Sequence, residues 1–219
     1  SPEFVLAQMH AVARDLDVGA IKIGMLATDE TVEAVASGLD AFPDVPVVLD
    51  PVMVASSGDL LIDETASGLL RERLVPRATV VTPNLDEAAV LLGEPPESRE
   101  QMLEGRAQRL LALGADMVLL TGGKSIAETA LDIFADANGI QRIEAPRHAT
   151  RNTHGTGCTL SSAIAAELAK GQGVEKAIKL AKMYVTAAII AADEIDVGQG
   201  AGPVHHFHAL WPRAEEERS

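Results

Sequence analysis

Short apolar runs alternate with segments of helical period along most of the chain. Residues 20–25, 45–50, 79–82 and 117–121 form apolar runs with the length of buried strands. Between the first two runs, Thr28-Asp29 is a typical helix N-cap, and the apolar residues that follow it have helical spacing: Val32, Val35, Ala36 and Leu39. This alternation predicts a three-layer α/β/α fold, with a mostly parallel central sheet covered by helices on both faces.

The pattern changes in the second half of the chain. Apolar runs at 131–135 and 140–144 flank Asp136-Ala137-Asn138-Gly139, and Asn-Gly is a strong hairpin signal. We therefore expect an antiparallel hairpin at one edge of the sheet. Helical patterns at 158–170 and from 174 to about 193 follow it.

Composition and charge limit the classes of protein to consider. A chain of 219 residues with 47% hydrophobic content can bury one core, so we assign residues 1–212 to a single domain and 213–219 to a solvated tail. The net charge of −14 argues against nucleic acid or an anionic membrane as a partner. The chain lacks an apolar run of about 18 residues, so we expect no membrane span. Its single cysteine fits a reducing cytoplasm.

Polar residues stand where the predicted strands end. Asp50 closes the second run, Asn84 and Glu87 follow the third, and Thr121 closes the fourth. Ligands of open α/β sheets bind at that edge. Asn84 and Glu87 share one face of a short helix, and their oxygens suit Mg²⁺ together with the Asp50 carboxylate. Alternatively, Asp86 and Glu87 only place favourable charge on the first helical turn.

The segment from Asn152 to Ser161, NTHGTGCTLS, predicts an anion site. Gly155 and Gly157 bracket Thr156 where an irregular segment becomes a helix, so backbone N–H groups can turn toward one point. Cys158 follows on the first helical turn, where the same field is expected to lower the thiol pKa. In the alternative interpretation the glycines only form a turn, and Cys158 is a small buried filler.

The extended string NTHGTGCTLSSAIAA closely resembles the signature of the hydroxymethylpyrimidine and phosphomethylpyrimidine kinases of thiamine synthesis, a ribokinase-like branch. Four other segments resemble motifs of that family and occur in the same order. AIKIGML, VVLDPVMVASSG and TPNLDEAAVLLG precede the signature string, and GPVHHFHALWP follows it, so the resemblance covers nearly the whole chain. The resemblance implies a ribokinase-like fold and a homodimer. It implies phosphorylation, with Mg-ATP as cofactor, of 4-amino-5-hydroxymethyl-2-methylpyrimidine and of its monophosphate.

The resemblance also assigns roles to residues. It makes Cys158 the general base for the acceptor, and it gives the moving phosphoryl group backbone donors at Gly155, Thr156 and Gly157. It places the metal and its water network on Asp50 and Glu87, with Asn84 beside them.

The remaining assignments concern the nucleotide and the ring. The resemblance implies phosphate contacts from Thr121 and Thr153, although a loop threonine is often only a local backbone partner. Relatives often carry lysine at position 121, and Lys124 is expected to replace part of that charge. Met25 and Val52 would contact the pyrimidine, and both equally fit a core.

The first predicted helix occupies residues 1–16 of this chain. In relatives of this kind, a strand, a glycine-rich loop and part of the pyrimidine pocket precede that helix. Because that part is missing, we expect this chain to bind Mg-ATP weakly and to show little activity. A pyridoxal kinase of the same branch and an inactive nucleotide-binding fragment are the alternatives.

The C-terminal region contains two further clusters of chemically active side chains. His205, His206 and His208 lack a partner cluster at metal-ligand spacing, so we predict a structural motif with Trp211 packed nearby. A solvated helix end is predicted at Asp193, Glu194 and Asp196.

Overall fold

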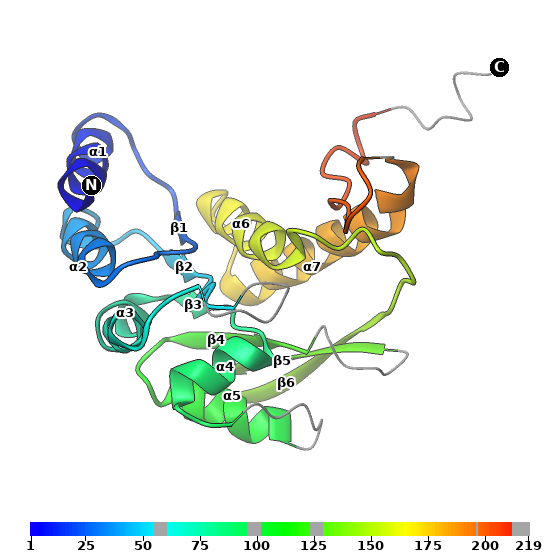
Figure 1. Cartoon of the computed structure of the whole chain (residues 1–219), viewed down its shortest axis with the longest axis horizontal. Helices are drawn as coiled ribbons and strands as arrows, with labels where there is room; N and C mark the ends of the chain where they lie inside the picture. Colours follow the sequence, from blue (N-terminus) through cyan, green and yellow to red (C-terminus); the bar gives the residue numbers. More distant parts are fainter. Residues whose placement is uncertain (55–60, 96–101, 123–128, 196, 212–219) are drawn as a thin grey trace.

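The computed structural model describes residues 1–54, 61–95, 102–122, 129–195 and 197–211, and its centre is one sheet (Figure 1). In these residues the sheet has six strands in the order β1-β2-β3-β4-β5-β6. The strands are β1 Ile21–Ile23, β2 Val47–Leu49, β3 Val80–Val81, β4 Met117–Thr121, β5 Thr129–Asp136 and β6 Gly139–Pro146. β1 to β4 are parallel, whereas β5 and β6 are antiparallel. The predicted parallel sheet with an antiparallel edge is confirmed.

Helices cover both faces of the sheet (Figure 1). One face carries α1 Pro2–Asp15, α2 Asp29–Gly38, α3 Glu64–Leu69, α4 Leu85–Leu92 and α5 Leu103–Leu111, and the other carries α6 Thr156–Ala169 and α7 Val174–Ile190. Short helical segments extend several of these: η1 Leu39–Ala41, η2 Leu70–Leu74, η3 Val75–Arg77 and η5 Ala191–Glu194. Successive residues of β2 point to opposite faces, so Leu49 belongs to one apolar core and Val48 to the other. The three-layer prediction is confirmed.

Local sequence signals account for several element boundaries. The Thr28 side chain accepts a hydrogen bond from the Thr31 amide at 3.3 Å, which caps α2 as predicted. In the β5–β6 turn, the Asp136 carboxylate accepts hydrogen bonds from the amides of Asn138 and Gly139 at 2.8 and 3.1 Å. Gly139 has a φ of 141°, a conformation that glycine adopts without a Cβ clash.

The parallel strands are shorter than the apolar runs, yet their hydrogen bonding continues toward the carboxyl edge. The Asp50 amide donates to Ile23 O and the Thr82 amide donates to Leu49 O, both at 2.9 Å. Residues just beyond β2 and β3 are therefore held by the neighbouring strand. This backbone order places their side chains precisely enough to form a site.

The C-terminal motif packs onto α6 and α7. His205 is buried and its ring lies 5.2 Å from that of Trp211, in agreement with the predicted structural role. The Tyr184 hydroxyl of α7 donates to His206 O at 2.8 Å. The described residues contain no group of three His, Cys, Asp or Glu side chains that could hold a metal ion.

Asp193 and Glu194 are exposed in η5, in agreement with the predicted solvated helix end. The Asp193 carboxylate also accepts hydrogen bonds from Asn152 Nδ2 at 3.0 Å and from the Thr150 hydroxyl. These bonds fix the segment that leads into α6.

Asp196, Lys124 and the predicted tail at 213–219 lie outside the described residues. None of the helices in the described part of the chain is long and apolar enough to cross a membrane.

Candidate functional site

The polar residues predicted at the strand ends meet at the carboxyl edge of the sheet, below the N-terminus of α6. Asp50 follows β2 and is only 4% exposed. Asn84 and Thr121 form a parallel bridge that joins the ends of β3 and β4. Ser161 of α6 donates to Asp50 Oδ2 at 2.9 Å. The sheet edge and the first turns of α6 therefore form one site.

The turn before α6 is shaped to receive an anion. Gly155 is the N-cap and has a φ of 81°, in the left-handed region. Helical bonding begins with the Thr159 amide, which donates to Gly155 O at 2.8 Å. The amides of Gly157 and Cys158 precede this bond, so they lack an acceptor within the helix. Together with the helix dipole they can stabilise a phosphate-like group.

Two further observations fit an anion above this turn. The Thr156 hydroxyl donates to Thr153 O at 2.7 Å, which braces the loop. A Cβ built on Gly157 would meet no atom within 4 Å, so the space beside its Cα is open. Packing within the protein therefore does not require glycine at position 157. The missing side chain instead leaves room for close approach of a ligand.

Asn84 and Glu87 form a capping box at the start of α4. Asn84 Oδ1 accepts from the amides of Asp86 and Glu87 at 2.9 and 3.0 Å, and Glu87 Oε2 accepts from the Asn84 amide at 2.9 Å. This capping box stabilises the first turn of α4, where Asp86 and Glu87 also place the acidic charge of the alternative interpretation. Glu87 is nevertheless only 5% exposed, unlike a solvated surface charge.

The carboxylates of Asp50 and Glu87 fit Mg²⁺ that arrives with a phosphate ligand. Both are buried and follow neighbouring strands. Mg²⁺ keeps several waters and usually takes only one or two protein carboxylates together with substrate phosphates. These donors therefore suit an ion held partly through water, although direct ligation by either residue stays a prediction.

Lys22 and Ser161 belong to the same cluster, and sequence reasoning assigned neither. Lys22 Nζ lies 3.4 Å from Asp50 Oδ2, the oxygen that also accepts from Ser161. The signal for Lys22 was a lone cation inside the apolar run AIKIGML, because a charge on a buried strand rarely lacks a partner. Ser161 offered no comparable signal, since its role depends on the distant Asp50.

The Cys158 thiol is exposed at the first turn of α6, so the prediction of a buried filler is wrong. The prediction of a lowered thiol pKa is also wrong. Partial loss of hydration raises the pKa of Cys158 most, and the negative charge of Asp50 raises it further, whereas Lys22 acts in the opposite direction. Because burial and the charge of Asp50 both favour the uncharged form, the free protein holds a neutral thiol at neutral pH.

The remaining predicted contacts lie around this cluster. Met25 follows β1 and is 53% exposed, so it is not a core residue, whereas Val52 is half-buried beside Asp50. The Thr121 hydroxyl donates to Pro83 O at 3.4 Å, and Thr153 is exposed at the turn. Contacts of these four residues with a ring or a nucleotide stay predictions.

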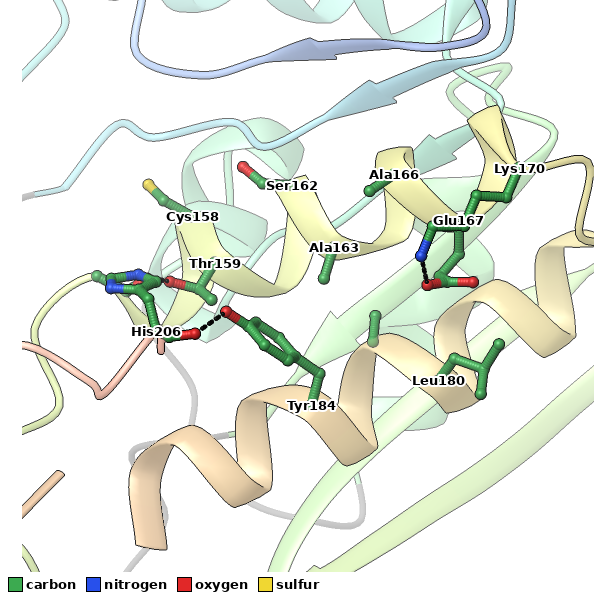
Figure 2. Close-up of a pocket in the computed structure, with 12 residues that line it drawn as sticks. Cys158, Thr159, Ser162, Ala163, Ala166, Glu167, Lys170, Leu180, Tyr184 and His206 are labelled. Atoms are coloured by element: carbon green, nitrogen blue, oxygen red, sulfur yellow. Dashed lines mark hydrogen bonds and ion pairs between the residues drawn. The ribbon is translucent and has the colours of Figure 1, made fainter. Parts of the chain in front are cut away.

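A groove with a volume of about 590 Å³ extends from the anion-binding turn along α6 and α7. Gly155 and Cys158 are among the residues that line it, and Figure 2 shows Cys158 and Lys170 at opposite ends of α6. Figure 2 shows Tyr184 of α7 between the two helices, where it bonds to His206, while His206 Nε2 lies 3.1 Å from Thr159 Oγ1. The C-terminal motif thus closes the groove beside the anion-binding turn.

Comparison with known proteins identifies similar kinases. A family model described as phosphomethylpyrimidine kinase matches residues 1–205. The hydroxymethylpyrimidine/phosphomethylpyrimidine kinase of Rhizobium meliloti is 51% identical over 211 residues, which covers 96% of this chain and 79% of that protein. The enzyme of the same name from Escherichia coli is 45% identical over 210 residues, with the same coverage.

The fold is similar to that of solved vitamin kinases. The structure of Bacillus subtilis pyridoxal kinase in complex with ADP matches with a TM-score of 0.85 and 38% sequence identity. The match covers 93% of this chain and 76% of that chain. This relative therefore combines the same architecture with a bound adenine nucleotide.

Proposed function

Because the chain belongs to the phosphomethylpyrimidine kinase family, we propose that it phosphorylates 4-amino-5-hydroxymethyl-2-methylpyrimidine and then the monophosphate product, with ATP as donor. In the first step the hydroxymethyl oxygen bonds to the γ-phosphorus, the bond to the β–γ bridging oxygen breaks, and ADP leaves. In the second step a phosphate oxygen of the monophosphate takes the place of the hydroxyl. Both steps are phosphotransferase reactions of thiamine biosynthesis.

One observation carries this proposal: α6 begins with amides that have no acceptor in the helix and with an exposed thiol, and its Ser161 hydroxyl donates to the buried Asp50 carboxylate. Phosphoryl transfer needs neutralised charge and an aligned acceptor more than it needs covalent help from the protein. The amides would hold the transferred group. Asp50 and Glu87 would hold Mg²⁺, whose positive charge, when bound, neutralises the phosphates and offsets the effect of Asp50 on the thiol.

Cys158 would orient the acceptor and, after its own proton has left to solvent, would receive the acceptor's proton as a thiolate. The thiol is neutral in the free protein, and a primary alcohol is a weak acid. We therefore infer that proton transfer accompanies formation of the oxygen–phosphorus bond instead of preceding it. Lys22 supports this role, because its charge favours the thiolate.

Glu87→Gln is expected to raise the Mg²⁺ concentration at half-maximal rate about three- to tenfold, because it removes a negative charge near the ion. Glutamine can still accept from the Asn84 amide, so the capping box and the melting temperature are retained. Mg²⁺ titration of turnover and thermal unfolding would measure the two effects. Asp86→Asn, the charge-matched control, should leave the Mg²⁺ curve in place. An unshifted curve with a lower melting temperature for Glu87→Gln would leave Glu87 only its capping role.

Pyridoxal kinase activity is the second candidate, favoured by the structural likeness to the Bacillus subtilis enzyme. Pyridoxal also presents a hydroxymethyl group on an aromatic ring, so the same chemistry could serve both acceptors. We expect kcat/KM to favour the pyrimidine by at least about tenfold, a difference that a few pocket contacts can supply. Parallel assays of one preparation would measure it. Preference for pyridoxal would reverse the assignment, and nucleotide binding without turnover of either acceptor would indicate an inactive module.

We also infer that residues 1–212 act as one kinase domain in the cytoplasm, and that the chain forms a homodimer as its family resemblance implies. The family match over residues 1–205 supports the single domain. Light scattering at several concentrations would test the dimer, and a monomer throughout would contradict it.

A further inference from the structure

The ammonium group of Lys22 lies against a buried carboxylate at the carboxyl edge of the sheet. Lys22 is the middle residue of β1, and its side chain is 22% exposed. The side chain reaches the carboxyl edge, where Nζ contacts Asp50. Gly24 lies on the same side of the strand, and a Cβ at this glycine would be only 2.7 Å from Lys22 Nζ. The ammonium therefore occupies the space that a side chain at position 24 would need.

Asp50 is also held by α6. The Ser161 hydroxyl is completely buried and donates to the same carboxylate oxygen that faces Lys22. Ser161 Oγ also lies 3.1 Å from the carbonyl oxygens of Gly157 and Cys158. One carboxylate oxygen is thus fixed between Lys22 of β1 and Ser161 of α6.

We propose that Lys22 is a positioning residue for the reaction: its ammonium fixes the Asp50 carboxylate below the anion-binding turn, and position 24 is glycine to leave room for that ammonium. A carboxylate as buried as Asp50 requires a compensating charge or hydrogen bonds. Once fixed, it defines where a cation and the phosphates can lie. The effect of Lys22 on turnover rests on the proposed kinase function, whereas its contact with Gly24 does not.

Turnover of Lys22→Ala, Gly24→Ala and the double variant would test the catalytic part. Misplacement of a reacting group by about 1 Å can cost about 10²-fold, so we expect kcat of Lys22→Ala to fall about 10- to 100-fold. Gly24→Ala keeps the charge but displaces the ammonium, and we expect about a tenfold loss. The double variant should be no slower than Lys22→Ala, because alanine at position 22 leaves no ammonium to displace.

The dependence on Mg²⁺ separates positioning from general damage. The ammonium and the cation compete for Asp50, so the Mg²⁺ concentration at half-maximal rate should stay equal or fall in Lys22→Ala while kcat falls. Lys179→Ala on α7 removes the same charge from a side chain that is 62% exposed, and it should leave both quantities unchanged. A kcat of Lys22→Ala within about threefold of the unsubstituted protein would overturn the proposal.

Urea unfolding of the same variants tests the contact without any activity. Gly24→Ala should lower the unfolding midpoint when Lys22 is present and should have no such effect in the Lys22→Ala background. Equal effects in both backgrounds would overturn the steric link between the two residues. This measurement remains decisive if the unsubstituted chain phosphorylates no pyrimidine, which would instead contradict the proposed function. If Lys22→Ala does not fold, Lys22→Met retains the aliphatic stem and replaces it in both experiments.

Discussion

Cys158→Ala is expected to lower turnover with the hydroxymethylpyrimidine about 10²- to 10⁴-fold, the usual effect of removing a general base. The affinity for ATP should remain nearly unchanged, because the backbone amides of the anion-binding turn are retained. Alanine fits the first turn of α6 and leaves no buried cavity, since the thiol is exposed. Steady-state kinetics and calorimetry with Mg-ATP would measure the two effects on one preparation.

Ser162→Ala provides the matched control for this experiment. Ser162 lies one helical turn after Cys158 and lines the same groove, but it has no part in the proposed chemistry. We expect its turnover to equal that of the unsubstituted protein. Activity of Cys158→Ala within about threefold of that value would remove the thiol from the base role.

The arrangement of elements could be predicted because its signals are local. The Asn-Gly turn, the Thr28 cap and the alternation of apolar runs with helical periods each depend on residues close in sequence. Strand lengths were less predictable: residues 79–82 read as one run, whereas β3 is only Val80–Val81. The assigned ends of a strand depend on tertiary contacts with its neighbours, and the Thr82 amide still donates to Leu49 O beyond β3.

The part of the candidate site that depends on local backbone conformation could be predicted from the sequence. Gly155 and Gly157 could be assigned to the turn because glycine conformation and a helix N-terminus suffice for that inference. The thiol pKa could not be predicted, because it depends first on burial in the folded protein and then on charges that are distant in sequence: Asp50 after β2, Lys22 in β1 and Glu87 in α4. The contact between Ser161 and Asp50 could not be predicted either, because the two residues are far apart in the sequence.

Gly157→Ala is expected to separate activity from stability. A Cβ at position 157 would meet no protein atom within 4 Å, and alanine is a better helix former than glycine, so unfolding stability should be equal or higher by up to about 1 kcal/mol. The new methyl group would lie in the space proposed for the phosphoryl group. We expect turnover to fall about 10²-fold or more, similar to the loss of one oxyanion donor. Thermal unfolding and kinetics of one preparation would measure both effects.

Gly155→Ala is the contrasting variant, because its effect should begin with the fold. Its φ of 81° costs a residue with a Cβ about 1–2 kcal/mol, which corresponds to about 2–8 °C in melting temperature for a chain of this size. Loss of both activity and stability in Gly157→Ala would mean that position 157 serves the helix and not a ligand. Full activity in Gly157→Ala would show that no phosphoryl group approaches that amide. Only a stable and inactive Gly157→Ala protein, beside a destabilised Gly155→Ala protein, agrees with an anion held over the first turn of α6.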